Sequence, residues 1–572
     1  MRPLRSSAWF SRDDEVGLEH RAAMRSAGHP VEAGAARPVI GLMSSINGFN
    51  PCNLPLRRLV DAARAGVEAA GGTAVELPVM SLGEDLMKPT AMLYRNLLAM
   101  EVEEYIRSQP VDGVVLFGNC DKTVPAQLMA AASADVPAIQ VTGGFRSPGR
   151  FRGAEVGAGT DLWAYWSERR AGQLDDEGWN GLEVALSCSQ GACNVMGTAM
   201  TMGILAETLG MMLPGSSVLP SDDPRLAELA TLAGRRIVDL VAQQQRPRDI
   251  LTEAAFDNAL LVLAACGGST NALVHLSAIA GRRGIRLSPD RLAVASAQTP
   301  VLVDVAPIGS SHIAAFSAAG GVPALLRELA PLLRRDVVSV GEAALGATVD
   351  SAASQVIRSL HDPVTDVPAF AVVHGNIAPD GALIKTAAAS PALLNHVGTA
   401  IVFDGYEDML ARIDDPELGA TAGSVLILRN CGPRAGDGFP EWGMIPVPKH
   451  LAEAGVTDMV RLSDARMSGT SFGTCVLHIA PDAASGGPLA LLRTGDVIEL
   501  DAAGGRIHAR VDAVQFDRRR ALWTKPTSRH RRGWPRLFDE HVLQAPEGCD
   551  FDFLVPEDDA ALEWQEPTVG RS

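Results

Sequence analysis

Gly118-Asn119-Cys120-Asp121-Lys122-Thr123-Val124-Pro125 is the stretch around which this chain is organised. It follows an apolar, β-branched run at 111–117 that is typical of a buried strand. An alanine-rich helical pattern follows it, and the first turn of that helix accommodates a proline. Ligands bind at the carboxyl edge of open parallel sheets. Thiolates select iron or zinc, whereas carboxylates select magnesium, manganese or calcium, so this one loop has donors for two different metals. The alternative is a buried cysteine beside a helix-capping aspartate.

The composition indicates a globular α/β protein with at least two domains. The 572 residues are 47% hydrophobic and 20% charged and include 56 glycines, which excludes a disordered chain. The net charge of −17 argues against a nucleic-acid partner. We interpret the basic cluster at 518–520 and 529–532 as a solvated loop or a subunit contact.

The chain shows no feature of a secreted or membrane protein. Residues 1–20 are polar and lack the apolar core of a signal peptide. No apolar run approaches the ~18 residues of a membrane span, so we expect a cytoplasmic protein with no membrane partner. The eight cysteines are too sparse for a disulfide scaffold. They indicate metal ligands or inert core thiols.

From residue 38 the pattern is a repeated strand, loop and helix. We predict an arm at 1–37, which packs on its own domain or on a neighbour, and an α/β domain at 38–362. Its predicted strands are 39–43, 73–77, 111–117 and 137–141, and its predicted helices include 56–70 and 91–108. Successive right-handed crossovers would place Cys52, Glu84 and 120–122 on one edge of a parallel sheet. If these cysteines were ordinary thiols of the core, we would expect no preference for one edge of the sheet.

Two further cysteines precede an apolar helical pattern at 195–212. Cys193 is predicted at the helix N-terminus, where the helix dipole favours the thiolate. The alternative is an ordinary buried cysteine at a close helix contact. Cys188 and Cys193 compete for a ligand role, and their spacing does not choose between them. The glycine-rich turn at 266–272 suits either anion binding or close packing.

The pattern changes after a break at 362–368 to short predicted strands at 370–374, 399–403, 425–429, 497–500 and 507–511. We predict a second domain at 363–572 that is a β-barrel or sandwich with some helices. Two of its loops have candidate chemistry: 430–441, which ends in Glu441, and 463–470, which carries Ser468. The alternative for each is structural, namely a solvated glutamate and an ordinary Ser-Gly-Thr turn.

Taken together, the motifs resemble the family that contains dihydroxy-acid dehydratase, phosphogluconate dehydratase and the sugar-acid (aldonate) dehydratases. The likeness covers nearly the whole chain and rests on four motifs in order: Cys120-Asp121-Lys122-Thr123-x-Pro125-Ala126, Gly267-Gly268-Ser269-Thr270-Asn271-Ala272, Gly375-Asn376-x-Ala378-Pro379-Asp380-Gly381 and Ser463-Asp464-x-Arg466-Met467-Ser468-Gly469-Thr470. Three further stretches are similar to the sugar-acid branch, such as arabinonate and xylonate dehydratases: Arg5-Ser6-x-x-Trp9-Phe10, Ser81-Leu82-Gly83-Glu84 and the tail at 541–554.

The resemblance implies two metal centres. One is an iron–sulfur cluster, [2Fe-2S] rather than [4Fe-4S], held by Cys52, Cys120 and Cys193. Because a cluster normally takes four thiolates, one iron would be open to a substrate oxygen. The other is Mg²⁺, with its ligands at Glu84, Asp121, Lys122 and Glu441. Lys122 would be carbamylated, which requires loss of its proton; burial and a neighbouring dication would depress its pKa.

The implied reaction is dehydration of a sugar acid, a pentonate or hexonate, to the 2-keto-3-deoxy acid. Mg²⁺ would hold the carboxylate and C2 hydroxyl, a Ser468 alkoxide would take the C2 proton, and the open iron would take the C3 hydroxyl as a Lewis acid. Ser468 and Lys122 are thus the predicted catalytic residues. The resemblance also implies a homodimer or homotetramer.

Two alternatives stay open, and one loop departs from the family. The first alternative is a dihydroxy-acid dehydratase of branched-chain amino-acid synthesis, and the second is a redox or electron-transfer iron–sulfur protein. The loop at 432–440 departs from the Lys-Gly-Tyr-Pro-Gly that relatives commonly have after Gly-Pro, which puts substrate specificity in doubt more than metal binding. Cys188 is expected to be a bystander.

Overall fold

The first unit is built on a parallel sheet enclosed by helices. A computed structural model describes residues 3–33, 37–157, 159–341, 354–558, 562–563 and 565–571. The sheet has the order β2-β1-β3-β4, with all neighbours parallel. Its strands are β1 (Val39–Ser44), β2 (Thr73–Pro78), β3 (Gly113–Phe117) and β4 (Ala138–Val141). β1, β3 and β4 are buried along their whole length, as expected for parallel strands covered on both faces. The predicted α/β class and strands are confirmed.

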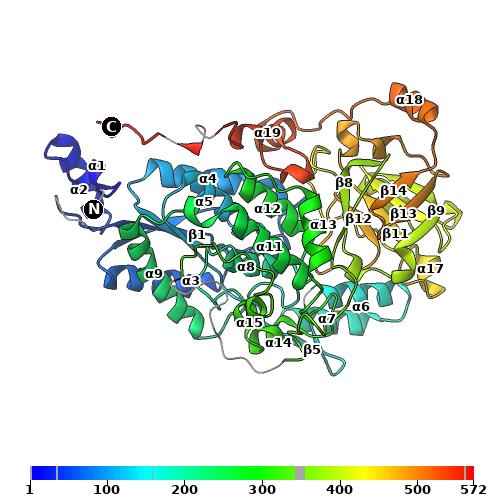
Figure 1. The fold of residues 1–572 in the computed structure, drawn as a ribbon, viewed down its shortest axis with the longest axis horizontal. Coiled ribbons are helices and arrows are strands. Elements are labelled where there is room, and N and C mark those ends of the chain that lie inside the picture. The colour runs from blue at the N-terminus through cyan, green and yellow to red at the C-terminus, as the bar shows by residue number, and fades with distance from the viewer. Residues whose placement is uncertain are drawn as a thin grey trace.

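Helices cover both faces of this sheet (Figure 1). α3 (Leu56–Ala69) and α9 (Arg225–Gln243) are in close contact. A Cβ on Gly66 would come within 2.0 Å of the Thr231 carbonyl oxygen, and one on Gly234 within 2.1 Å of the Ala63 carbonyl oxygen. Only glycine therefore permits these two backbones to approach so closely. α4 (Arg95–Ser108), which continues the 3₁₀ turn η1 (Ala91–Tyr94), connects β2 to β3. α5 (Thr123–Ala134) connects β3 to β4.

The remaining helices of this unit form a largely buried layer and a peripheral group. The buried layer is α8 (Thr198–Thr208), α11 (Glu253–Ala265) and α12 (Asn271–Gly281). The peripheral elements are β5 (Gly149–Phe151), β6 (Ala154–Val156), α6 (Thr160–Arg170), α7 (Asp176–Leu186), α10 (Pro247–Ile250), α13 (Pro289–Gln298), α14 (Ile313–Ala318) and α15 (Gly321–Glu328).

The structure corrects the sequence analysis around Cys193. α8 begins at Thr198 instead of residue 195, because Gly197 is its N-cap. Cys193 therefore lies four residues ahead of the cap and is not at the helix N-terminus. Burial raises the pKa of its thiol to about 12.

The second unit is a closed barrel with the strand order β10-β11-β12-β8-β7-β14-β13-β9. Its strands are β7 (Ala371–Gly375), β8 (Ala378–Ile384), β9 (Asn395–Asp404), β10 (Val425–Arg429), β11 (Val460–Ser463), β12 (Cys475–Leu477), β13 (Val497–Asp501) and β14 (Arg506–Ala509). The expected barrel or sandwich is thus a barrel. β8 was missed because it contains a proline and a glycine, and β11 and β12 because they are too short to show alternation.

Short helices surround the barrel. They are α16 (Tyr406–Arg412), α17 (Lys449–Glu453) and α18 (Ala513–Leu522), with the 3₁₀ turns η2 (Thr386–Ala388), η3 (Pro391–Leu393), η4 (Pro416–Leu418), η5 (Ala483–Ser485) and η6 (Pro488–Leu491). No helix in the described part of the chain is long and apolar enough to cross a membrane.

Both ends of the chain dock on the first unit (Figure 1). The arm contains α1 (Ser7–Phe10) and α2 (Glu15–Ser26), and Ser6 donates two hydrogen bonds, of 2.9 and 2.7 Å, to Asp112. Of the two packing partners predicted for the arm, the structure shows its own domain. The tail runs from the barrel through α19 (Gly533–His541), η7 (Ala545–Glu547) and η8 (Asp552–Leu554). There the buried Asp550 forms an ion pair with Arg282, just past α12.

Candidate active site

Three loops meet at the carboxyl edge of the parallel sheet. Cys52 lies between β1 and α3, Glu84 follows β2, and 120–122 joins β3 to α5. Because β1 pairs with both β2 and β3, these loops are neighbours. Asn53 Oδ1 accepts hydrogen bonds from the backbone N–H groups of Asn119 and Cys120, at 3.1 and 3.0 Å. Asn119 Nδ2 donates in return to the Cys52 carbonyl at 2.7 Å. The predicted convergence on one edge is therefore what the fold shows.

Cys52 interacts electrostatically with each of the other two predicted cluster cysteines, Cys120 and Cys193. A hydrogen bond with Cys52 and burial raise the pKa of Cys120 well above its ordinary value. Burial raises the pKa of the Cys193 thiol, the positive charge of Arg146 lowers it, and the nearby Cys52 raises it. The segment before Cys193 is tied to the Cys52 loop by a hydrogen bond of 3.1 Å from the Gly191 N–H to the Pro51 carbonyl. Without a metal, Cys120 and Cys193 are therefore protonated at neutral pH.

Cys188 is placed apart from this group. It is exposed, and its Sγ donates to the Ser147 carbonyl at 3.2 Å. The two cysteines that the spacing could not separate are thus separated by burial and by their neighbours.

Three carboxylates converge on the ammonium group of Lys122. Lys122 Nζ lies 2.6 Å from Asp121 Oδ2, 2.9 Å from Glu84 Oε2 and 3.0 Å from Glu441 Oε1. The lysine side chain is fully buried, and the carboxylate side chains are 13–24% exposed. Glu441 comes from the barrel unit, so this cluster joins the two units of the chain.

The charged groups in this cluster strongly shift one another's pKa values. Burial and Arg466 act to lower the pKa of Lys122, but the three carboxylates outweigh them and raise it above its ordinary value. The pKa of Glu441 is lowered to about 2, because Lys122 and Arg466 outweigh its burial. Burial instead raises the pKa of Glu84. In the metal-free protein Lys122 is therefore an ammonium ion, and the proton loss expected at this residue depends on the incoming dication.

Arg466 and Asn271, for which the sequence predicted no role, complete the cluster. Arg466 is fully buried and donates to Glu441 Oε1 at 2.7 Å and to Thr90 Oγ1 at 3.2 Å. Thr90 Oγ1 donates in turn to Glu84 Oε1 at 2.7 Å. Asn271 Nδ2 donates to Glu441 Oε1 at 2.7 Å. Both lie in motifs quoted from the sequence. Only the fold shows that Arg466 links Glu441 through Thr90 to the carboxylate of the first unit. Asn271, which belongs to the first unit, holds Glu441 of the barrel unit.

The Ser468 loop packs directly against the glycine-rich turn. Asn271 Nδ2 also contacts the Met467 carbonyl at 3.1 Å, and a Cβ on Gly469 would come within 2.6 Å of the Ser269 side chain. Of the two uses predicted for the turn, the structure shows close packing. The partly buried Ser468 shares a 2.9 Å hydrogen bond with Thr470 Oγ1. The Ser468 loop is thus joined to the carboxylate cluster through Asn271.

The donor sets fit the two implied metals by their chemistry. Among the described residues, no three or more His, Cys, Asp or Glu side chains form a preformed single-ion site. The carboxylates instead surround the ammonium group of Lys122. Their oxygens are the kind of ligand that a hard cation prefers. The cysteines supply soft sulfur donors beside them. Thiols that bind different irons of one inorganic core need not share a single-ion site.

The loop that departs from the family pattern is held by the tail. Arg434 Nε donates to the Val542 carbonyl at 2.8 Å, and Asp437 forms an ion pair with Arg529. Glu441 nevertheless reaches Lys122. The altered sequence therefore leaves the carboxylate in place at Lys122.

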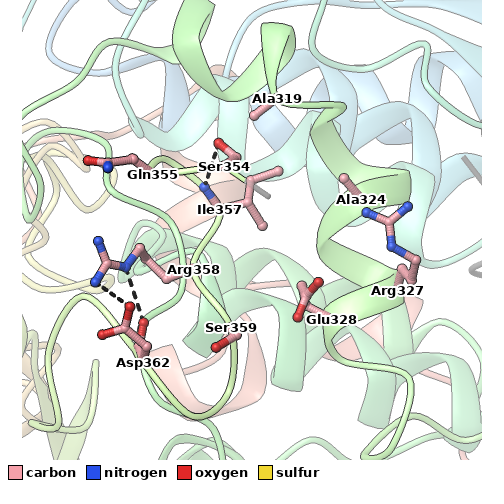
Figure 2. A pocket seen from close by; sticks show the side chains of 10 residues that line it. All are labelled: Ala319, Ala324, Arg327, Glu328, Ser354, Gln355, Ile357, Arg358, Ser359 and Asp362. Atoms are coloured by element: carbon pink, nitrogen blue, oxygen red, sulfur yellow. Dashed lines mark hydrogen bonds and ion pairs between the residues drawn. The ribbon is translucent and has the colours of Figure 1, made fainter. Parts of the chain in front are cut away.

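A separate surface pocket of about 540 Å³ lies away from this cluster (Figure 2). It lies beside α15, and its lining includes Arg327, Glu328, Ser354 and Arg358. Arg358 is already paired with Asp362 at 2.5 Å. None of the predicted ligands is among the described residues that line it, so this pocket does not belong to the site.

Comparison with known proteins identifies the chain's family. Residues 37–348 match the dihydroxy-acid/6-phosphogluconate dehydratase N-terminal model, and residues 355–549 match the C-terminal model. The chain is 46% identical to 6-deoxy-6-sulfo-D-gluconate dehydratase of Pseudomonas putida, and the match covers 96% of each chain. It is 44% identical to L-arabonate dehydratase of Azospirillum brasilense, over 96% of this chain and 97% of the relative. It is 42% identical to L-arabinonate dehydratase of Rhizobium leguminosarum bv. trifolii, over 97% and 96%. The chain therefore belongs to the dihydroxy-acid/6-phosphogluconate dehydratase family and is an enzyme of the dehydratase (hydro-lyase) class.

Proposed function

We propose that this enzyme dehydrates a sugar acid, a pentonate or a hexonate, to the 2-keto-3-deoxy acid. The observation that carries the proposal is the convergence of three carboxylates on Lys122 beside the cysteine group. The relatives' names support the substrate class, since they act on sulfogluconate and on arabinonate (arabonate). A sugar acid has the required chemistry, because its C2 proton lies next to a carboxylate and its C3 hydroxyl is the group to be lost.

Each metal has a set of residues to hold it. Cys52, Cys120 and Cys193 would hold the iron–sulfur cluster, [2Fe-2S] rather than [4Fe-4S]. The oxygen donors for Mg²⁺ are Glu84, Asp121, Glu441 and, once carbamylated, Lys122. When bound, the cluster supplies a Lewis acid for the departing hydroxyl, and Mg²⁺ supplies positive charge beside the substrate carboxylate. Since metal binding releases protons from thiols, the high pKa values of Cys120 and Cys193 make cluster loading dependent on pH.

Ser468 is the proposed base. Its hydroxyl lies on the loop that Asn271 joins to Glu441, so the base and the carboxylate cluster are held in one network. Ser468 Oγ, as the alkoxide, takes the proton from C2, and hydroxide leaves from C3. Ser468 then gives this proton to the hydroxide, so that water departs and the alkoxide is restored, and the enol that remains tautomerises to the 2-keto acid. A serine hydroxyl is a weak base unless its own proton is removed. Thr470 Oγ1, at 2.9 Å, orients the Ser468 hydroxyl.

Lys122 has two proposed states. In the metal-free protein its ammonium group neutralises the carboxylates. Carbamylation converts the amine into an anionic oxygen donor and requires the neutral amine, so it is coupled to arrival of a dication that replaces the lost positive charge. Intact-protein mass measured with and without bicarbonate and Mg²⁺ tests this step.

Anaerobic purification and a substrate panel test the function. We expect iron and sulfide in the protein and 2-keto product from one or more pentonates or hexonates. Turnover of 2,3-dihydroxyisovalerate in preference to every sugar acid would instead establish the branched-chain dehydratase. Reversible reduction of a cluster without turnover of any polyhydroxy acid would favour an electron-transfer protein and refute the proposal.

Substitution of the base gives a sharper test. Ser468→Ala should keep its iron and Mg²⁺ content and lose turnover by at least about a hundredfold, the lower end of what a positioned base contributes. Ser471→Ala, in the same loop, is the matched control and should remain active. An active Ser468→Ala enzyme would exclude Ser468 as the base.

The proposal includes a cytoplasmic homodimer or homotetramer. Light scattering coupled to size-exclusion chromatography measures the assembly, and a monomeric active enzyme would contradict it.

A further inference from the structure

We propose that Arg146 contacts the iron–sulfur cluster and that its positive charge raises the cluster's reduction potential and slows its loss in air. The inference rests on the proposed cluster site at Cys52, Cys120 and Cys193, and it assigns a role to a residue outside every motif used above.

Arg146 is built into the junction of the two loops that carry Cys52 and Cys193. Its Nη2 lies 4.0 Å from Cys52 Sγ, in a long hydrogen bond to sulfur, and its charge acts on both Cys193 and Cys52. Its backbone N–H donates to the Ala192 carbonyl at 2.9 Å, and its Nε donates to the Gly191 carbonyl at 3.2 Å. The side chain is therefore fixed against the segment that leads directly into Cys193.

Gly191 makes this approach possible. Its φ is +122°, a conformation that other residues rarely adopt. A Cβ at this position would lie 2.8 Å from the backbone nitrogen of Arg146. The glycine therefore lies where the backbone of Arg146 comes close to the segment that leads to Cys193.

Among the described residues, the guanidinium of Arg146 has no carboxylate closer than 4.0 Å. Its side chain is only 12% exposed, yet the single carboxylate within 4.0 Å among the described residues is Asp85, whose side chain is 61% exposed. Buried charges are normally paired. Thiolates and bridging sulfides concentrate negative charge on sulfur, so a cluster at these cysteines supplies the missing anion.

Arg146 both contacts Cys52 Sγ and lines a surface pocket. It lines a pocket of about 580 Å³ together with Pro51, Trp179 and the exposed Cys188. Removal of the guanidinium would therefore take away the positive charge and open the sulfurs to water and dioxygen on this side.

The sign of the effect on potential follows from electrostatics. Reduction adds a negative charge to the cluster, and a nearby positive charge stabilises the reduced form. Loss of Arg146 should therefore shift the potential in the negative direction. Loss of the Asp85 carboxylate should shift it in the positive direction, because the guanidinium charge then acts on sulfur alone.

The experiment uses the anaerobically purified full chain. The wild type, Arg146→Met, Arg146→Lys and Asp85→Asn are titrated potentiometrically, and the visible absorption of the cluster is followed after exposure to air. Arg150→Gln is the matched control, since Arg150 is exposed and donates to the Gly153 carbonyl. A charge-assisted hydrogen bond contributes about 1.5–3 kcal/mol, so cluster loss should be about tenfold faster or more in Arg146→Met.

We expect a negative shift for Arg146→Met, a smaller one for Arg146→Lys, a positive one for Asp85→Asn and none for Arg150→Gln. Thermal unfolding of each cluster-free variant shows whether it folds, and Asp85→Asn keeps the test valid if Arg146→Met does not. The inference about Arg146 is overturned if the cluster of Arg146→Met keeps the wild-type reduction potential and lifetime in air, or if the reduction potential is unchanged in Asp85→Asn. Either result leaves the proposed function intact. A wild-type protein that binds no cluster after anaerobic reconstitution overturns the proposed function as well.

Discussion

Replacement of Arg466 by methionine tests whether this residue holds the two units together at the carboxylate cluster. Arg466 is fully buried and donates to Glu441 Oε1 at 2.7 Å, to the Phe439 carbonyl at 2.7 Å and to Thr90 Oγ1 at 3.2 Å. Methionine preserves the apolar stem and removes all three donors. Glu441 then keeps only Lys122 and Asn271 as hydrogen-bond partners in the described structure.

The structure sets the size of the effect. Removal of one partner of a buried ion pair costs about 3–5 kcal/mol, and we expect about 3 kcal/mol because two donors to Glu441 remain. For a unit of roughly 150–250 residues, 1 kcal/mol lowers the unfolding midpoint by about 2–4 °C. The metal-free Arg466→Met protein should therefore unfold about 6–12 °C below the wild type. Its affinity for Mg²⁺ should also fall, because Glu441 is less firmly oriented.

Thermal unfolding followed by circular dichroism measures the first effect, and titration calorimetry with Mg²⁺ measures the second. Arg510→Met is the control within the barrel: its ion pair with Glu499 spans 2.5 Å, but the arginine side chain is 58% exposed, so less than about 1 kcal/mol is expected. A midpoint for Arg466→Met no lower than that of Arg510→Met would refute the reasoning.

Three further predictions concern buried groups elsewhere. Burial lowers the pKa of Lys385 from 10.5 to about 7, and its Nζ has no hydrogen-bond partner among the described residues. Between pH 7 and pH 10.5 the unfolded chain therefore binds more protons than the folded chain, so the free energy of unfolding of the wild type should rise over this range. Lys385→Met should unfold at a higher temperature at pH 7 and lose that rise; a less stable variant would contradict the prediction. Asp550→Asn should weaken the buried pair with Arg282 by about 3–5 kcal/mol, and faster hydrogen exchange at 541–554 is the readout; unchanged exchange would show that the pair does not hold the tail. Cys193→Ser should lose most of its iron and Cys188→Ser should retain it, and equal iron content in the two variants would reopen the choice between them.

The first unit could be predicted from the sequence because its local patterns are strong. The apolar runs at 39–43, 73–77, 111–117 and 137–141 are each a few residues long and bounded by loops, and the helices between them impose parallel pairing. The edge that gathers Cys52, Glu84 and Cys120 follows from that pairing alone.

The barrel was harder to predict in detail. β8 contains Pro379 and Gly381, which usually argue against a strand, and their place in the barrel depends on pairing with β7 and β12, strands on either side in space. The helix at 160–170 escaped prediction because it has little apolar periodicity.

The sequence by itself determined the family, the class of reaction and the residues with ligand chemistry, because these depend on residue types at short spacings within single loops. Only the tertiary structure decided which distant side chains share a charge environment. It placed Arg466 and Asn271 against Glu441, showed that Cys188 is more exposed than Cys193, and set Arg146 against the sulfur of Cys52. The reason is physical: burial and Coulomb energies depend on distance in space, and a short stretch of sequence has no pattern that records contacts with residues far along the chain.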